Sequence, residues 1–284
     1  RLAHPAGGHP RAARPRAAVI DTAPGGAHDL GPRAPPPAGG PAAAGVVVPG
    51  LVDEEAGTAV LAANLGWRDT PVRRWLAEHL DLPVAFGHDV RAGGIAESRL
   101  GAGRDCRNFA FVPVGTGIAA ALVIDGRPFA GDHGFAGEFG HLVVRPGGDR
   151  CACGNRGCLE TVASASAVAR RYAEAGGETG VSAKDVLCRA QAGDGPAVQV
   201  RAEAVDALAD GLAALTVLLD FERIVIGGGL AEAGEPFLNP LRTAVAERLT
   251  FRAAPRLVAA ELGHRAGSLG AALLAQDLLD GGGR

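Results

Sequence analysis

Four residues that could bind one metal ion lie close together in the middle of this 284-residue chain. Three are cysteines within eight residues, Cys151, Cys153 and Cys158, and the fourth is His141, ten positions before the first of them. Three thiolates and one imidazole make a complete tetrahedral ligand set for Zn²⁺, and the glycines between 147 and 157 would let the backbone fold tightly enough to bring them together. Because protein atoms would fill all four positions, we expect a structural metal rather than a catalytic one.

The alternative for these cysteines is a set of buried thiols, or one disulfide and a spare thiol. A disulfide between Cys151 and Cys153 would be strained, because residues two positions apart rarely reach the required geometry. An odd cysteine count, five in this chain, also fits a disulfide framework poorly. Zinc is therefore favoured. Two carboxylates, Glu138 and Glu160, lie on either side of the four residues in the sequence. They are candidates for the functional side chains that the loop positions.

The residue order over 137–160 resembles the signature of a known family. Gly-Glu-x-Gly-His is followed by Cys-x-Cys-Gly-x-x-Gly-Cys-x-Glu, and this order is similar to that of the ROK family of repressors and sugar kinases. The resemblance implies an α/β, two-lobed actin/hexokinase-like ATPase fold, with ribonuclease H-like lobes and a zinc-bound loop. It also implies that Glu138, His141 and Glu160 line the sugar pocket, with His141 binding zinc through its other ring nitrogen. The pattern alone does not separate a kinase from a sugar sensor.

A further carboxylate stands where a strand is predicted to end. The stretch 82–97 (LPVAFGHDVRAGGIAE) predicts a strand, a loop and a helix, with Asp89 at the end of the strand. ROK kinases have a similar segment with Asn-Asp, and the resemblance implies that Asp89 is the base that takes the proton of the sugar hydroxyl. His88 replaces that Asn, and its imidazole can still hydrogen-bond a hydroxyl. The alternative is that Asp89 only caps the following helix.

Three other segments resemble binding segments of the family. Asn64-Leu65-Gly66-Trp67 is similar to a segment near the sugar, although a turn with a packed Trp is an equal alternative. Gly115-Thr116-Gly117 follows a predicted strand and resembles the second phosphate loop. Gly227-Gly228-Gly229 follows another strand and resembles the adenosine loop. Any strand and turn can carry Gly-Thr-Gly, and three glycines can also serve as a hinge.

The first 43 residues differ from the rest of the chain. Nine of the nineteen prolines lie within the first 45 residues, and we expect 1–43 to be largely disordered or aberrant. A kinase of this family would open with a hairpin carrying Asp-x-Gly-Gly-Thr, the first phosphate loop. The segment 21–26 (DTAPGG) resembles this loop only weakly. Pro24 lacks a backbone N–H, and no Thr follows the glycines. The resemblance therefore does not extend to the first phosphate loop, which in the family binds ATP.

From residue 44 onward the pattern is that of an ordered α/β protein. We expect 44–107 to form a smaller lobe, joined by a C-terminal helix over 266–284, and 108–265 to form a larger lobe that contains the zinc loop 137–160. Helical spacing predicts helices over 71–80, 161–175 and 196–219. Strands are predicted over 45–48, 108–113, 118–124, 223–226 and 257–262.

Composition narrows the class of protein. The net charge of −3 gives no electrostatic reason to expect nucleic-acid binding. No apolar run reaches the length of a membrane span, and no charged-then-apolar leader is present, so we expect no membrane partner and a cytoplasmic location. The resemblance also implies a homodimer.

The leading hypothesis is an enzyme that phosphorylates a glucose-like hexose with ATP, with Mg²⁺ accompanying the nucleotide and Zn²⁺ in the loop. One alternative is a catalytically impaired sugar-binding ROK protein that lacks the first phosphate loop. The other is a sugar-sensing ROK transcriptional regulator. Family repressors carry an N-terminal winged helix-turn-helix, and residues 1–43 are too short and too rich in proline to form one.

Overall fold

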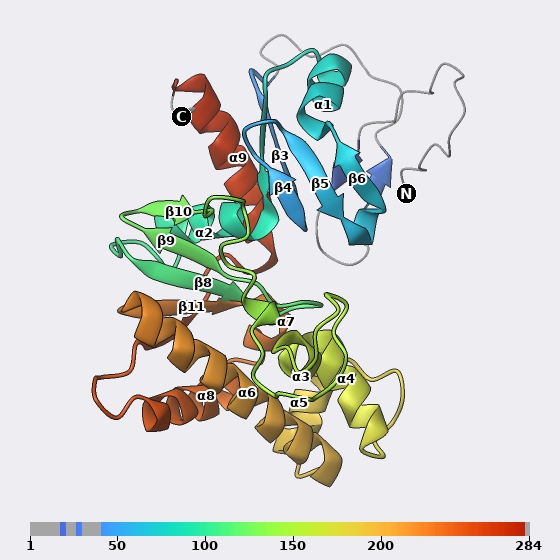
Figure 1. Cartoon of the computed structure of the whole chain (residues 1–284), viewed down its shortest axis with the longest axis vertical. Coiled ribbons are helices and arrows are strands. Elements are labelled where there is room, and N and C mark those ends of the chain that lie inside the picture. The colour runs from blue at the N-terminus through green and yellow to red at the C-terminus, as the bar shows by residue number, and fades with distance from the viewer. Residues whose placement is uncertain (1–17, 21–26, 30–40, 282–284) are drawn as a thin grey trace. The chain divides into compact units, whose positions relative to one another are not determined.

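The structure, a computed structural model, describes residues 18–20, 27–29 and 41–281, which divide into two compact units (Figure 1). Unit 1 comprises the chain up to Ala96, the segment Ala130–Phe135 and the chain from His264 onward. Unit 2 comprises Glu97–Phe129 and Ala136–Gly263. The chain therefore passes into unit 2 inside helix α2 (Asp89–Leu100), before the position 107 expected from the sequence, and returns once for a short segment.

Unit 1 contains a parallel pair of strands. β3 (Ala44–Val48) pairs with β7 (Val84–His88), in register from Ala44 opposite Val84 to Val48 opposite His88. An antiparallel meander of β4 (Leu51–Asp53), β5 (Thr58–Ala62) and β6 (Trp67–Thr70) belongs to the same unit. Both strands of the parallel pair are apolar apart from His88 at the end of β7, which agrees with strands that are covered on their faces.

Part of the N-terminal region is also described. β1 (Ala18–Ile20) and β2 (Ala27–Asp29) form an antiparallel pair, so these six residues of the region expected to be disordered are strands. The segment 21–26, which echoes the first phosphate loop, lies outside the described residues, as does most of 1–43.

The α-helices α1 (Val72–Leu80) and α9 (Ala266–Leu279) belong to unit 1, as do the first residues of α2. α9 packs closely on β3, because a Cβ atom on Gly45 would lie 1.9 Å from the carbonyl oxygen of Ala271. A Cβ atom on Gly270 would lie 2.1 Å from the carbonyl oxygen of Ala92 in α2. Glycine is required at both positions because the two backbones nearly touch.

Unit 2 is built on a five-stranded mixed sheet in the order β10-β9-β8-β11-β12. Its strands are β8 (Phe109–Pro113), β9 (Ala121–Ile124), β10 (Arg127–Phe129), β11 (Arg223–Gly227) and β12 (Arg256–Ala259). β8, β11 and β12 run parallel, and Pro113 at the end of β8 lies opposite Gly227 at the end of β11. The loops that follow these two strands therefore leave from the same edge of the sheet, where α/β proteins bind ligands.

The core of unit 2 lies between this sheet and its helices, of which α6 and α8 lie side by side (Figure 1). The helices are α3 (Glu160–Ala163), α4 (Ala165–Glu174), α5 (Ala183–Gln191), α6 (Gly195–Leu219), α7 (Gly228–Ala231) and α8 (Glu235–Arg248). α6 begins where the side chain of Asp194 accepts the N–H of Ala197, and it confirms the helix predicted over 196–219. Among the residues that the structure describes, no helix is both long enough and apolar enough to cross a bilayer.

The helix predicted over 161–175 is wrong in one respect, because it is broken at Ser164. The hydroxyl of Ser164 accepts the N–H of Ala167 at 3.1 Å and starts α4 as a separate helix. The N–H of Ala165, the first residue of α4, donates to the carbonyl oxygen of Gly115 at 2.7 Å. The break therefore brings the start of α4 against the turn that follows β8.

Candidate active site

The four predicted metal ligands converge in unit 2. The ligand atoms of His141, Cys151, Cys153 and Cys158 all lie within 4.8 Å of one another. The Cys151 sulfur lies 3.5 Å from Nδ1 of His141, and the sulfurs of Cys153 and Cys158 lie 3.7 Å apart. A tetrahedral Zn²⁺ with bonds of about 2.3 Å to sulfur and about 2.1 Å to nitrogen places S and N about 3.6 Å apart, and two sulfurs about 3.8 Å apart. Donor set and spacing both fit Zn²⁺, and all five cysteines are free thiols.

The protein atoms alone keep most of these thiols protonated. Burial raises the pKa of Cys151 and raises that of Cys158 to about 12, while the backbone N–H of Asn155 lowers the pKa of Cys153. A bound cation reverses this preference, because its charge stabilises thiolates. Metal binding at this cluster should therefore release protons and weaken in acid.

The second ring nitrogen of His141 faces a carboxylate. Its Nε2 lies 3.7 Å from Oε2 of Glu138, and both side chains are partly exposed. Glu138 directly precedes the short 3-10 helix η2 (Phe139–His141), and the N–H of His141 donates to the carbonyl oxygen of Glu138 at 3.0 Å. Nδ1 of His141 thus faces the thiols while Nε2 faces Glu138 and solvent.

The shape of the loop depends on Gly157. Its carbonyl oxygen accepts the N–H groups of Val144 and Arg145 at 2.9 and 3.0 Å, which pairs the two sides of the loop. Gly157 has a φ of +76°, and a Cβ atom there would lie only 1.6 Å from the carbonyl oxygen of Arg145. Only glycine can occupy this position without moving the backbone.

Ion pairs hold the loop on two sides. The Arg145 guanidinium contacts Asp206 and, at 2.5 Å, Asp210, both on α6. Asp149 pairs with Arg170 at 2.9 Å and Arg171 at 3.2 Å, both on α4. The hydrogen bond from Arg170 holds the pKa of Asp149 below its usual value. These side chains are partly exposed, so each pair contributes little by itself.

Glu160 connects this loop to the Gly115-Thr116-Gly117 turn. It opens α3, and its Oε2 accepts the N–H of Ile118 at 3.0 Å. A Cβ atom on Gly117 would lie 2.6 Å from the same oxygen, so the turn and the carboxylate are in direct contact. Residues expected for the sugar and for a phosphate therefore meet within unit 2.

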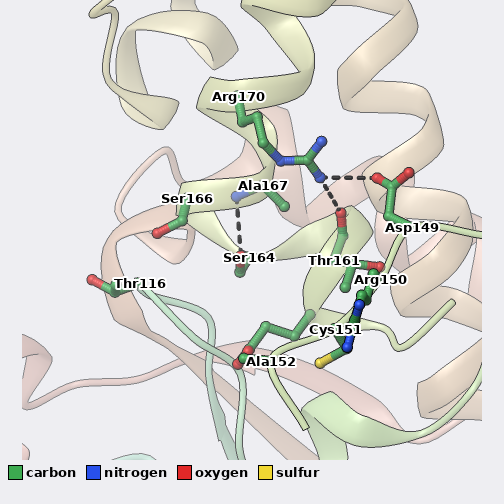
Figure 2. Close-up of a pocket in the computed structure, with 11 residues that line it drawn as sticks. Thr116, Asp149, Arg150, Cys151, Ala152, Thr161, Ser164, Ser166, Ala167 and Arg170 are labelled. Carbon is green, nitrogen blue, oxygen red and sulfur yellow. Dashed lines mark hydrogen bonds and ion pairs between the residues drawn. The ribbon is translucent and has the colours of Figure 1, made fainter. Parts of the chain in front are cut away.

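An open polar cavity of about 520 Å³ lies beside this turn (Figure 2). Thr116, Glu160, Ser166 and the segment 149–152 contribute to its lining. Figure 2 shows Ser164 turned toward the N–H of Ala167, and Arg170 turned toward Asp149 and Thr161. The hydroxyl groups of Thr116 and Ser166 in this lining can donate to an anionic group such as a phosphate.

The triple glycine packs against Val114, the residue directly before the Gly115-Thr116-Gly117 turn. Gly227 ends β11 and Gly228 opens α7 with a φ of +77°. A Cβ atom on Gly228 would lie 2.4 Å from the carbonyl oxygen of Val114, which also accepts the N–H of Leu230 at 3.2 Å. No atom lies within 4 Å of a Cβ built on Gly229, so this backbone is open on that side.

In unit 1, Asp89 stands at the junction of β7 and α2. Its Oδ1 accepts the N–H of Val90 at 2.7 Å and lies 3.5 Å from Nε2 of His88. Burial, followed by the charge of Arg91, lowers the pKa of His88 to about 3, so its ring is neutral near pH 7. Asn64, the remaining residue expected near the sugar, is exposed in the turn η1 (Ala63–Leu65) of the same unit.

Sequence reasoning missed two residues that hold this junction, Glu54 and Arg91. Oε1 of Glu54, in the turn between β4 and β5, accepts the backbone N–H of His88 at 2.9 Å and Nε of Arg91 at 3.0 Å. Arg91 is only 4% exposed and also donates to the carbonyl oxygen of Gly134 at 3.1 Å. The one sequence signal for Arg91 was an arginine among the small residues of a predicted helix. No residue spacing indicated that its partner would be Glu54, 37 positions away.

The expected residues fall into two sets. Asn64, His88 and Asp89 belong to unit 1. The four candidate metal ligands, the two glutamates and both glycine loops belong to unit 2.

Comparisons with known proteins agree on one family. The sequence matches the profile described as "ROK family" over residues 22–278. It is 36% identical over 246 residues to the glucokinase of Halalkalibacterium halodurans, which covers 80% of this chain and 73% of that protein. It is also 32% identical over 246 residues to the DNA-binding transcriptional dual regulator NagC of Escherichia coli, over 83% of this chain and 61% of the regulator.

A solved structure supports the same conclusion for the fold. The ROK family glucokinase of Streptomyces griseus, in complex with glucose and AMPPNP, superposes with a TM-score of 0.76 at 32% identity. The match covers 82% of this chain and 81% of that one. The two-lobed kinase fold expected from the sequence is therefore confirmed.

Proposed function

Because this chain belongs to the ROK family, we propose that it transfers the γ-phosphoryl group of ATP to a hydroxyl of a glucose-like hexose. The likeness to glucokinases along most of the chain is the observation that carries this proposal. The position of Asp89 supports it, because a carboxylate at the end of a strand can serve as the base that such a reaction uses.

In this proposal the sugar is held by Glu138, His141, Glu160 and Asn64. Carboxylates accept hydrogen bonds from sugar hydroxyls, and such charge-assisted bonds are stronger than neutral ones. Nε2 of His141 lies on the side of the ring away from the thiols, so it can take part in the same network. Oε2 of Glu160 already accepts one backbone N–H, which fixes the carboxylate before a ligand arrives.

The nucleotide is assigned to the two glycine loops. Gly115, Thr116 and Gly117 would approach the phosphates beside the polar cavity. Gly227, Gly228 and Gly229 would lie against the adenosine, where the open backbone at Gly229 leaves room. A divalent ion such as Mg²⁺ accompanies ATP in this chemistry and neutralises charge on its phosphates.

The chemical step assigned to Asp89 is a proton transfer. The oxygen of the sugar hydroxyl forms a bond to the γ-phosphorus as the bond between that phosphorus and the bridging oxygen breaks. The bridging oxygen keeps the electron pair and leaves with ADP, and the carboxylate of Asp89 receives the hydroxyl proton.

Zinc is assigned a structural role. Nδ1 of His141 and the sulfurs of the three cysteines would hold the ion, which cross-links the loop and fixes the plane of the imidazole. With four protein ligands the ion would be structural, and Nε2 of His141 would face the sugar.

The direct test is ADP release from Mg-ATP by the purified protein, across a panel of hexoses that includes glucose. We expect sugar-dependent ADP release that is saturable in both substrates. Sugar binding without ADP release would instead select the catalytically impaired binding protein. The absence of Asp-x-Gly-Gly-Thr at 21–26 favours that alternative.

The likeness to NagC makes a DNA mobility-shift assay the test of the regulator alternative. Light scattering in solution tests the homodimer that we infer from the family.

A further inference from the structure

His88 is enclosed by protein on both sides of its ring. The residue is 8% exposed and ends β7, directly before Asp89. Nδ1 lies 3.4 Å from the backbone nitrogen of Arg91, and Nε2 lies 3.5 Å from Oδ1 of Asp89. Both ring nitrogens therefore already face a protein partner, which is unusual for a side chain expected to bind a sugar.

The partners fix the position of the ring proton. A backbone N–H can only donate, so Nδ1 must be the acceptor and Nε2 must carry the proton. Burial and the charge of Arg91 lower the pKa of His88 to about 3, which keeps the ring neutral. A neutral ring with its proton on Nε2 can donate to the Asp89 carboxylate without placing a positive charge beside it.

Glu54 and Arg91 hold the backbone around His88 in place. Oε1 of Glu54 accepts the backbone N–H of His88 and receives two nitrogens of Arg91, each at 3.0 Å. The third nitrogen of Arg91 donates to the carbonyl oxygen of Gly134 at 3.1 Å. The buried guanidinium is thus neutralised by one carboxylate and satisfied at three nitrogens, which locks the first turn of α2 against β7.

We propose that His88 is a positioning residue, whose Nε2–H donates to Oδ1 of Asp89 and holds the base in one orientation, with Glu54 and Arg91 fixing the imidazole. This inference rests on the proposed role of Asp89 as the base. It replaces the expectation that His88 contacts the sugar, because a sugar hydroxyl would have to displace Arg91 or Asp89 from the ring. Orientation of a reacting group affects the rate of the chemical step more than the affinity for substrate.

The kinetic test compares three variants with wild-type protein. His88→Ala removes the donor and should lower kcat on the order of tenfold to a hundredfold, with the sugar Kd changed less than about threefold. His88→Asn keeps an N–H donor of similar reach and should restore most of kcat. His79→Ala, at an exposed histidine in α1, is the matched control and should leave both constants unchanged. A rise in sugar Kd with unchanged kcat in His88→Ala would overturn the proposal in favour of a sugar contact.

A second measurement does not depend on activity. In protein labelled with ¹⁵N-histidine, the His88 signals are assigned by their loss in His88→Asn. We expect a neutral ring with its proton on Nε2 between pH 5 and 8, and a shift of the Nε2–H signal in Asp89→Ala. A proton on Nδ1, or protonation of the ring near its ordinary pKa of about 6.5, would refute the proposal. Absence of ADP release in wild-type protein would instead count against the proposed kinase activity alone.

Discussion

In unit 1 the Asp89 carboxylate stands at the junction of a strand and a helix, whereas in unit 2 the cluster of His141 and three cysteines stands in a loop with little regular structure. The first region is held by hydrogen bonds to a buried arginine and by close backbone packing. The second is shaped by one indispensable glycine and by partly exposed ion pairs, and its four convergent side chains are placed so that a metal ion would cross-link them. The chain therefore supports its two sets of candidate residues by different physical means.

Because the two regions are supported differently, they should resist different perturbations. A region held by packing keeps its geometry when metal is removed and loses it when buried groups are altered. A region held by a metal and by surface ion pairs depends on pH, chelators and salt.

Asp89→Asn should have the largest effect on activity. The amide cannot accept the hydroxyl proton, so kcat should fall by about 10²–10⁴-fold. Asn can still accept the N–H of Val90, so the fold and the zinc content should be unchanged. ADP release and metal analysis measure the two quantities, and turnover above a tenth of the wild-type rate would show that Asp89 is not the base.

Cys153→Ser should weaken unit 2. Loss of one thiolate lowers metal affinity, and we expect stability to fall by about 3 kcal/mol or more, together with a loss of sugar affinity. Cys188→Ser, at an exposed free thiol of α5, is the control. Thermal unfolding and zinc content are the measurements, and the His88 signals in unit 1 should not move. Equal melting temperatures for the two variants, or no change when a chelator strips the metal, would contradict a structural zinc.

Gly157→Ala and Gly154→Ala separate crowding from backbone strain within one loop. Both glycines have positive φ values, +76° and +95°. A Cβ atom at 157 would overlap the carbonyl oxygen of Arg145, whereas one at 154 would have no atom within 4 Å. We expect Gly154→Ala to cost about 1 kcal/mol and Gly157→Ala to cost about 3 kcal/mol, measured by denaturant unfolding. A larger cost at 154 than at 157 would mean that the loop is shaped differently.

Asp149→Asn should have the smallest effect. The hydrogen bond from Arg170 lowers the pKa of Asp149, so the carboxylate stabilises the fold above its unfolded pKa of about 3.9, and this contribution fades as the pH falls through the lower folded value. Because the pair is partly exposed, the difference from wild type should be a few tenths of a kcal/mol at pH 7 and should shrink below about pH 4. Thermal unfolding at several pH values checks this, and a difference that grows in acid would give the opposite sign.

The metal-ligand loop was the part most open to sequence reasoning. The four candidate ligands lie within 18 residues and are of types that bind Zn²⁺, so their convergence could be predicted without knowledge of the fold. The positions of Asp89 and of the glycine turns after β8 and β11 could be predicted for a similar reason, because each follows a recognisable apolar strand. Long helices such as α6 were predictable from periodicity.

Features that depend on long-range contacts were not predictable. The break at Ser164 arises because the N–H of Ala165 bonds to Gly115, 50 positions earlier, and no local propensity encodes that contact. The Glu54–Arg91 pair joins residues 37 positions apart. The passage from unit 1 to unit 2 inside α2 was also missed, since a helix shows no change in periodicity where one compact unit gives way to another.

The most direct test of this division of roles is the sugar affinity of two variants, Asp89→Asn and Glu160→Gln, measured by calorimetry with glucose in the presence of zinc. We expect Asp89→Asn to bind the sugar within about threefold of wild type, because the base contributes to the chemical step. Glu160→Gln should lose at least about tenfold in sugar affinity, because the carboxylates of unit 2 are assigned to bind the sugar hydroxyls. Loss of sugar affinity in Asp89→Asn together with unchanged affinity in Glu160→Gln would contradict it.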